Sequence, residues 1–104
     1  MATTSKVLYR GAAATSNTTL YTVPNSSTTT VVTNIAITNT AASSATATVN
    51  IDSVAVLSGV SVAANTTTFV DLKQVIPANA TPKTVSGSAS ATTVNFHISG
   101  VEIV

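Results

Sequence analysis

The sequence predicts an all-β protein, a single antiparallel β-sandwich or jelly roll of about seven to nine strands. Three observations predict it. Thr, Ser, Ala and Val supply 65 of the 104 residues, and 36 of these are Thr or Val, whose β-branched side chains favour strands over helices. Apolar and polar residues alternate through several segments, as they do on a strand with one buried face. Turn-forming residues separate these segments at intervals of roughly 8–12 residues.

The first half of the chain contains five expected strands, each ended by a turn signal. In the longest of them, Val31, Ile35 and Ile37 are expected to share one face, because side chains alternate along a strand. The dipeptide Ser58-Gly59 is expected to end a strand. The five ranges are 6–11, 18–23, 28–40, 46–57 and 60–63.

The second half contains three more expected strands, over residues 66–72, 83–90 and 92–99. A proline-containing loop over residues 77–82 separates the first two of these strands. In the last strand, Val94, Phe96 and Ile98 are expected to share one face, while His97 lies on the other.

Gly100 marks a change of phase near the end of the chain. Apolar positions are even-numbered before it, whereas Val101 and Ile103 are odd-numbered. A glycine at such a switch indicates a β-bulge, in which one extra residue shifts the alternation.

The length predicts one domain. We expect residues 1–11 to form an N-terminal arm or first strand and residues 12–104 to form the β-sandwich domain. Residues 1–6 lack the apolar segment of a signal peptide. No apolar run approaches the roughly 20 residues that cross a bilayer, so we expect no membrane partner.

Charged residues make up 7% of the chain, against about 25% in a typical soluble domain. The net charge is +1, from four scattered basic residues and three acidic ones. Nucleic-acid binding requires clustered Lys and Arg that neutralise phosphates, so we expect no nucleic-acid partner.

The acid–base groups available for catalysis are few. The carboxylates Asp52, Asp71 and Glu102 fall in three separate expected strands, His97 is the single histidine, and the chain has no Cys. General acid–base catalysis and metal binding both need such groups brought together. We therefore expect no enzyme activity, no cofactor and no metal site, and we interpret His97 as a surface or interface residue.

The four aromatic residues have two alternative readings. In the favoured one, Phe69 and Phe96 lie in the core, and Tyr9 and Tyr21 lie at the sheet margin with their hydroxyls in water. In the alternative, the two Tyr rings form an exposed platform that binds carbohydrate.

The surface composition points to assembly. Mean hydropathy is +0.44, and the charges that normally protect exposed sheet edges are scarce. A surface of this kind is expected to be covered by neighbours in a closed oligomer or a lattice, so we expect a homo-oligomer.

Several segments resemble small virion structural proteins of tailed bacteriophages. They are Thr18-Thr19-Leu20-Tyr21-Thr22-Val23-Pro24, the strand that ends Ile35-Ala36-Ile37-Thr38-Asn39, the turn Ala64-Asn65-Thr66-Thr67, and the final strand Val94-Asn95-Phe96-His97-Ile98-Ser99-Gly100-Val101-Glu102-Ile103. The resemblance covers most of residues 7–103. It implies a structural component of the particle, of the capsid decoration (cement) or tail-associated type, and it carries no catalytic residue.

Of these two types, our leading hypothesis is a capsid decoration protein on the virion surface, assembled in the host cytoplasm. The expected partners are further copies of the chain, as a trimer, and the major capsid protein or other virion proteins. Two alternatives remain: a tail or fibre-associated structural protein, and a secreted Ig-like or carbohydrate-binding module.

The contact elements are expected to be residues 2–11 and residues 100–104. The candidate interface residues are Val7, Leu8, Tyr9, Arg10, Tyr21, His97, Val101, Glu102 and Ile103.

Overall fold

Eight strands form the part of the chain that the computed structural model describes, residues 2–104. Met1, which falls in the expected N-terminal arm, lies outside the described residues. The strands are β1 (Thr3–Ala12), β2 (Thr18–Thr22), β3 (Thr29–Asn39), β4 (Ala45–Ile51), β5 (Val54–Val62), β6 (Thr66–Ile76), β7 (Thr84–Ala89) and β8 (Val94–Ile103).

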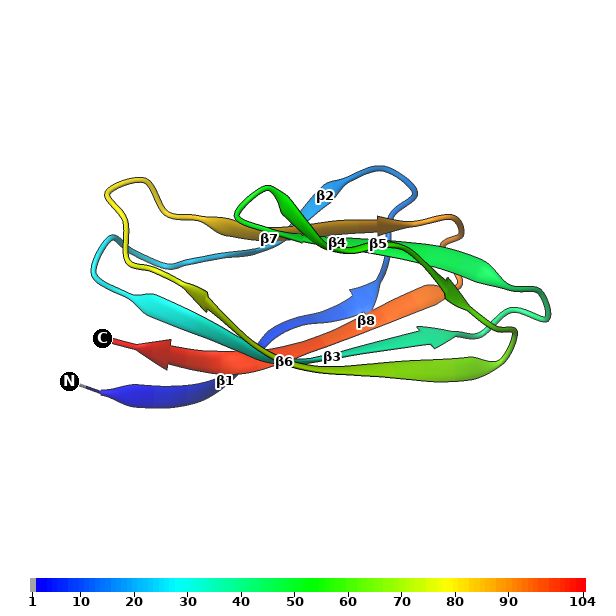
Figure 1. Cartoon of the computed structure of the whole chain (residues 1–104), viewed down its shortest axis with the longest axis horizontal. Helices are drawn as coiled ribbons and strands as arrows, with labels where there is room; N and C mark the ends of the chain where they lie inside the picture. The colour runs from blue at the N-terminus through cyan, green and yellow to red at the C-terminus, as the bar shows by residue number, and fades with distance from the viewer. Residues whose placement is uncertain (1) are drawn as a thin grey trace.

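The strands form two four-stranded antiparallel sheets packed face to face, with the orders β1-β8-β3-β6 and β2-β7-β4-β5 (Figure 1). Four of the ladders join β1 to β8, β2 to β7, β3 to β6 and β4 to β5. The first strand thus pairs with the last, the second with the seventh, and so on toward the middle of the chain. This is the strand pairing of a jelly roll, in which one long antiparallel hairpin wraps into two sheets. The all-β fold predicted from the sequence is therefore confirmed.

The core lies between the two sheets and is made mainly of branched aliphatic side chains around the rings of Tyr21 and Phe96. Phe96 is fully buried, and Ile35, Ile98, Val49 and Val85 are also 0% exposed. The alternation predicted for the last strand is confirmed, since Val94, Phe96 and Ile98 point inward while His97 is exposed.

The predicted phase of β3 is correct at only one end of the strand. Ile35 and Ile37 are buried as expected, but Val32 is the buried residue nearer the start, and Val31 is partly exposed. The reason is an extra residue, Thr33, between the paired positions Val32 and Asn34. This bulge shifts the alternation by one residue.

The bulges near Gly100 lie in the two neighbouring strands, whereas the pairing in β8 is continuous. Thr33 is the extra residue in β3 and Leu8 is the extra residue in β1. A Cβ at position 100 would clash with the carbonyl oxygen of Val31 and would lie 2.9 Å from Cδ1 of Leu8. Gly100 is therefore needed because the strands approach closely at this point.

The expected strand over residues 46–57 is wrong, because a tight hairpin turn interrupts it. Asp52 and Ser53 both have positive φ, at 54° and 63°, and they join β4 to β5 through the pair Ile51 and Val54. Two successive positive φ values match a type I′ turn. The expected break at Ser58-Gly59 instead lies inside β5.

Asn39 is a fully buried polar residue that connects two turns to the end of β3. Its amide nitrogen donates to the carbonyl oxygens of Ser43 at 2.8 Å and Val62 at 3.2 Å. Its carbonyl oxygen accepts the backbone N–H of Ala41 at 3.1 Å. These bonds satisfy the amide group away from water.

The N-terminal segment is an integral strand of its sheet. Residues 3–12 pair with β8 along their length, and Leu8 is buried in the core. The backbone of Ala2 exchanges two hydrogen bonds with Val104, at 3.1 and 2.9 Å, so the two ends of the chain lie side by side (Figure 1).

Candidate functional site

The surface of sheet β1-β8-β3-β6 that points away from the core carries several exposed apolar side chains. We call this surface the apolar face. Ladder register and burial show which side chains point away from the core. Phe69 is 70% exposed, Val75 is 60% exposed and Val7 is 47% exposed. The apolar residues of this face are Val7, Val31, Phe69, Val75, Val101 and Ile103.

The outward surface of sheet β2-β7-β4-β5 has a different composition, and we call it the hydroxyl face. In β4 the outward residues are Thr46, Thr48 and Asn50, because Ala45, Ala47 and Val49 between them are buried. Their partners in β7 include Ser88, which pairs with Thr48, and Ser86, which pairs with Asn50. The two faces therefore differ: the first carries large exposed apolar side chains among its polar ones, whereas β4 and β7 of the second present small polar side chains.

Phe69 was expected in the core, and the structure shows that this is wrong. It pairs with Ala36 on the outward side of β6, while Val70 and Leu72 on the inward side pack against the core. A signal was present in the sequence, because Phe69 has the same parity as Asp71 and the opposite parity to Val70 and Leu72. The expected burial of Phe96 is confirmed.

One row of paired residues crosses all four strands of the apolar face. Arg10 pairs with His97, His97 with Ala36, and Ala36 with Phe69. Asp71 lies two residues beyond Phe69, on the same side of β6, where its carboxylate accepts a hydrogen bond from the amide of Asn34 at 3.1 Å. Arg10 thus lies at one edge of the sheet, whereas Asp71 and the exposed Lys73, two residues further along β6, lie at the other.

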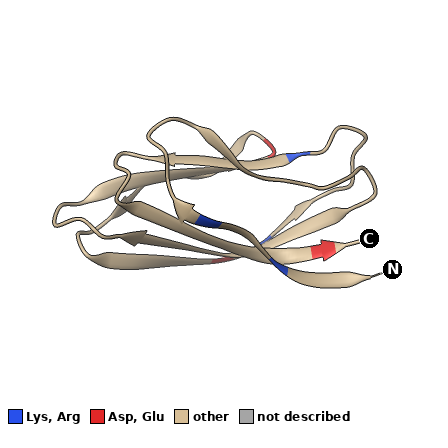
Figure 2. Cartoon of the chain, turned by 180° about the vertical axis from the view of Figure 1, so that it is seen from behind, with Lys and Arg blue, Asp and Glu red and all other residues tan. Residues whose placement is uncertain are grey.

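Charged residues are few and scattered over the molecule (Figure 2). Two ion pairs occur within residues 2–104: Lys6 with Glu102 at 3.2 Å and Lys83 with Asp52 at 3.5 Å. Both pairs are at least partly exposed, and exposed pairs contribute little to stability.

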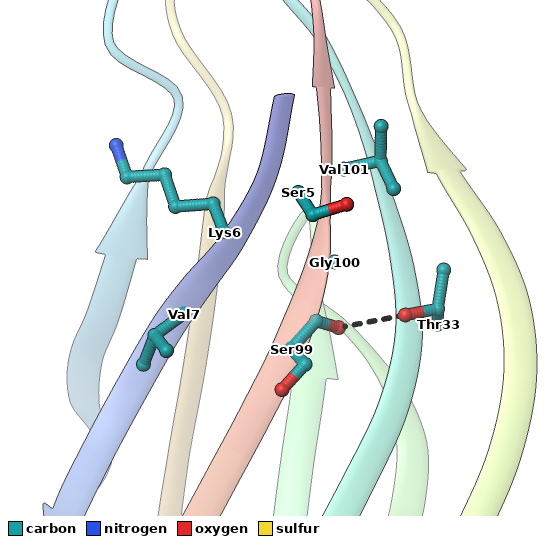
Figure 3. A pocket seen from close by; sticks show the side chains of 7 residues that line it. All are labelled: Ser5, Lys6, Val7, Thr33, Ser99, Gly100 and Val101. Carbon is teal, nitrogen blue, oxygen red and sulfur yellow. Dashed lines mark hydrogen bonds between the residues drawn. The ribbon is translucent and has the colours of Figure 1, made fainter. Parts of the chain in front are cut away.

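A shallow depression of about 350 Å³ lies at the two bulges, across β1, β8 and β3 (Figure 3). The small residues Ser5, Ser99 and Gly100 line it, and Val7 and Val101 add apolar side chains. The hydroxyl of Thr33 donates to the carbonyl oxygen of Ser99 at 3.3 Å. Lys6 is the one charged residue of the lining, and the lining offers no candidate nucleophile–base pair. Its small side chains leave room for a projecting group from another surface.

Tyr21 lies in a hydrogen-bonded cluster between the sheets, which differs from the wet position expected for it. The ring is buried, with 7% of the residue exposed. The phenol donates to Oε2 of Glu102 at 2.5 Å, and its oxygen lies 2.8 Å from the hydroxyl of Thr30. Burial, together with the hydrogen bond to the Glu102 carboxylate, raises the pKa of Tyr21 to about 12.

The candidate interface residues fall into two groups. The first group points outward from the sheet and is at least partly exposed: Val7, Arg10, His97, Val101 and Ile103.

The second group points inward. The side chains of Leu8 and Tyr21 are buried within the protomer, Glu102 is held by Lys6 and Tyr21, and Tyr9 is partly buried with its hydroxyl bonded to the carbonyl oxygen of Ala12 at 2.8 Å. We therefore no longer propose the second group as contact residues. Sequence reasoning missed Val31, Phe69 and Val75 on the apolar face.

The platform of two tyrosines that carbohydrate binding would require is not formed, because Tyr21 is buried while Tyr9 packs against the core edge. His97 and Asp71 lie on one face, whereas Asp52 is in the hairpin of the other sheet. Among residues 2–104, no three side chains of His, Cys, Asp or Glu gather into a group that could hold a metal ion. The same residues include no long apolar helix of the kind that crosses a bilayer.

Comparison with known proteins identifies the fold. No protein-family model and no curated protein matches the chain. The chain is similar to part of a chain in the crystal structure of the T13 particle of IBDV, infectious bursal disease virus, with a TM-score of 0.55 and 14% identity over 97% of this chain. Structures of the Gx and Gt strains of this virus match with TM-scores of 0.46 and 0.37 and identities of 15% and 17%, again over 97% of this chain.

The structural neighbours are thus chains of viral particles, and the likeness at this identity is one of fold. The chain spans 30% of the length of the matched chain in the T13 particle and 29% of those in the other two structures. Infectious bursal disease virus is not a tailed bacteriophage, so the tailed-phage resemblance of the sequence rests on its own motifs.

Proposed function

We propose that this chain is a structural protein of a virus particle, and that it acts through contact area and not through catalysis. In its specific form the proposal is a capsid decoration (cement) protein of a tailed bacteriophage. Homo-oligomers of the chain assemble in the host cytoplasm and sit on the virion surface against the major capsid protein. The number of copies is not part of this proposal: the trimer expected from the sequence and the two-fold dimer argued below exclude each other, and sedimentation equilibrium decides between them.

The apolar face is the observation that carries this proposal. Phe69 and Val75 are each at least 60% exposed, although only 7% of the residues are charged. Val31 and Val101 lie beside Val75 in the ladders, and exposed apolar side chains grouped in this way mark protein–protein contact sites. When neighbouring subunits cover this face, a domain with so few charges does not aggregate through it.

The fold adds support at a coarser level. Jelly rolls recur in viral capsid proteins, and the solved structures that resemble this chain come from a viral particle. Fold alone does not fix function, so the contact role rests on the face and its composition.

The mechanism is the addition of many modest contacts. A cement protein binds at repeated sites on a shell, and linked contacts raise the overall strength of attachment without any single tight interface. A rigid sandwich suits this role because its surface loses little conformational freedom on binding.

Electron microscopy of the virus that encodes the chain tests the proposal. An antibody raised against the recombinant protein is expected to label the head at regularly spaced positions. Label on the tail would support the tail-associated alternative and overturn decoration. Absence of label on disrupted and intact particles alike would overturn a virion role altogether.

A gain-of-stability assay complements the imaging. Particles that lack the protein are mixed with recombinant chain, and the temperature of genome release is followed with a DNA-binding dye. Decoration predicts a higher release temperature and saturable binding, whereas an unchanged temperature would contradict the cement mechanism.

A further inference from the structure

We propose that the apolar face binds the same face of a second copy of this chain, around a two-fold axis that runs parallel to the strands. The inference concerns pairing of copies and does not depend on the place of the chain in a virus particle. It rests on the composition of the two faces, on the cross-strand register and on the positions of the charges.

The contrast between the two faces selects the surface. The apolar face presents Phe69, Val75 and Val7 to solvent, while the outward residues of β4 and β7 are Thr, Ser and Asn. Each face is formed by four strands of the same domain. The two faces therefore differ in their side chains and not in their number of strands. Removal of the exposed apolar side chains of the first face from water is favourable. Removal of the hydroxyl and amide groups of the second face from water is unfavourable unless each finds a hydrogen-bond partner.

The two-fold axis brings opposite edges of the face together. Rotation about an axis parallel to the strands places β1 of one copy over β6 of the other. Positions along the strands do not change, so each row of paired residues lies over the same row of the partner. The row Arg10-His97-Ala36-Phe69 then lies against the same row of the partner, with the order of the four residues reversed. Each Arg10 therefore faces the partner's Phe69, and this contact occurs twice.

The charges of the face become complementary in this arrangement. A guanidinium over an aromatic ring gains a cation–π attraction. Asp71 lies two residues from Phe69 on the same side of β6, roughly 7 Å along the strand, which is within reach of a long arginine side chain. Arg10 of one copy thus meets both the ring and the carboxylate of the other, while Lys73 lies two residues beyond that carboxylate on β6.

A second row gives complementary shapes. Ser5 pairs with Val101, Val101 with Val31, and Val31 with Val75. Reversal of this row places Val75, which is 60% exposed, opposite the partner's Ser5. Ser5 is one of the small residues that line the depression (Figure 3), so an apolar projection meets a hollow.

The other in-plane two-fold axis, perpendicular to the strands, lacks these features. It would stack β1 on β1 and β6 on β6. Asp71 would then lie over the partner's β6, where Lys73 is exposed. Arg10, however, would remain over the partner's β1 without an aromatic ring, and Val75 would no longer face the partner's Ser5. The register therefore favours the axis parallel to the strands.

The area is sufficient for a specific contact. Four strands spaced by about 4.8 Å, each about ten residues long at about 3.3 Å per residue, give a face of roughly 600 Å². Two such faces bury roughly 1,200 Å² in total, at the lower end of stable interfaces. We therefore expect a dimer that forms at micromolar to millimolar protein concentration.

Sedimentation equilibrium and native mass spectrometry of the full chain test the pairing. A dimer is expected, and Phe69→Ser is expected to raise its dissociation constant at least about tenfold, as loss of a central anchor does. The matched control is Val54→Ser, because Val54 is 68% exposed but lies in β5 of the other sheet. This control is expected to leave the constant within about twofold.

A charge exchange tests the axis itself. Arg10→Asp and Asp71→Arg are each expected to weaken the dimer about tenfold, because each places like charges near one another. The double variant is expected to restore the dissociation constant to within about threefold of the original, which a folding defect could not do.

Three results would overturn the proposal. The first is a monomer at protein concentrations up to about 1 mM. The second is a trimer, since three copies cannot share this two-fold contact. The third is a dimer whose dissociation constant is unchanged by Phe69→Ser and by both charge reversals.

Discussion

The phenol oxygen of Tyr21 in β2 lies 2.5 Å from Oε2 of Glu102 in β8, so one hydrogen bond joins the two sheets directly. The same carboxylate accepts the ammonium of Lys6 in β1 at 3.2 Å. The Tyr21 phenol has one proton, which it donates to the carboxylate, so the hydroxyl of Thr30 at 2.8 Å donates to the phenol oxygen. The cluster therefore links side chains from four strands, β1, β2, β3 and β8.

Removal of this hydroxyl is expected to destabilise the fold. Tyr21→Phe leaves the Glu102 carboxylate and the Thr30 hydroxyl each without one partner, at a cost of about 1–2 kcal/mol in the free energy of unfolding. Urea denaturation at neutral pH measures it. Tyr9→Phe is the control, because that hydroxyl bonds only to the exposed carbonyl oxygen of Ala12, and its cost is expected to be smaller. Equal effects of the two variants would contradict the proposed role of the cluster.

The same residue predicts a stability loss at alkaline pH. Burial raises the pKa of Tyr21 from 10.0 to about 12 in the folded protein, so the folded state holds the phenol proton more tightly than the unfolded state does. The contribution is fully present below pH 10 and is lost as the pH rises from 10 to about 12. The difference in unfolding free energy between the natural protein and Tyr21→Phe should therefore shrink over this range. A difference that stays constant with pH would show that the phenol is not protected.

Gly100 is expected to tolerate no larger residue. In Gly100→Ala the new methyl group would clash with the carbonyl oxygen of Val31, in a central strand that cannot move without breaking its ladders with β1 and β3. We expect a loss of about 3 kcal/mol or more.

Gly59→Ala is the matched control for this variant. No atom lies within 4 Å of a Cβ at position 59, but its φ of +58° is unfavourable for alanine, so the expected cost is about 1–2 kcal/mol. Thermal unfolding of both variants measures the order. A Gly59→Ala variant less stable than Gly100→Ala would overturn the close-approach argument.

The sequence predicts strands and buried faces well where alternation is uninterrupted. Val94, Phe96 and Ile98 are buried as expected because β8 has no inserted residue. Ile35 and Ile37 follow the same rule. The predicted burial of Phe69 is wrong because the direction of a side chain in a strand follows its position in the alternation and not its size. Phe69 shares the outward-facing positions of β6 with Asp71.

Bulges and tight turns account for the other errors, because their effect depends on the neighbouring strand. The phase change at Gly100 was visible in the sequence, but the extra residues are Leu8 and Thr33 in the paired strands. The hairpin at Asp52 and Ser53 lacks the glycine that usually marks such turns. The apolar face could not be identified before the register was known, since its residues come from four strands.

Asn39 is expected to contribute more to stability than Asn34, which is only partly buried on the same strand. Asn39→Ala removes bonds to the carbonyl oxygens of Ser43 and Val62 and to the N–H of Ala41, which should cost about 1–3 kcal/mol. Asn34→Ala removes one exposed bond to Asp71 and should cost less than about 0.5 kcal/mol. Urea titration of the two variants provides the comparison. Costs of similar size would show that the buried amide is not needed to hold the turns.

Leu8 and Val7 test whether the N-terminal segment is a free arm or a part of the core. The two residues are neighbours in β1, yet Leu8 is 7% exposed and Val7 is 47% exposed. Leu8→Ala should therefore cost about 2–4 kcal/mol, because it leaves a cavity beside Gly100, while Val7→Ala should stay within about 0.5 kcal/mol. Urea denaturation measures both. A small cost for Leu8→Ala would mean that β1 detaches readily, and the segment would then act as an arm; the expected large cost means that deletion of residues 1–10 would damage the fold as well as any contact made by this strand.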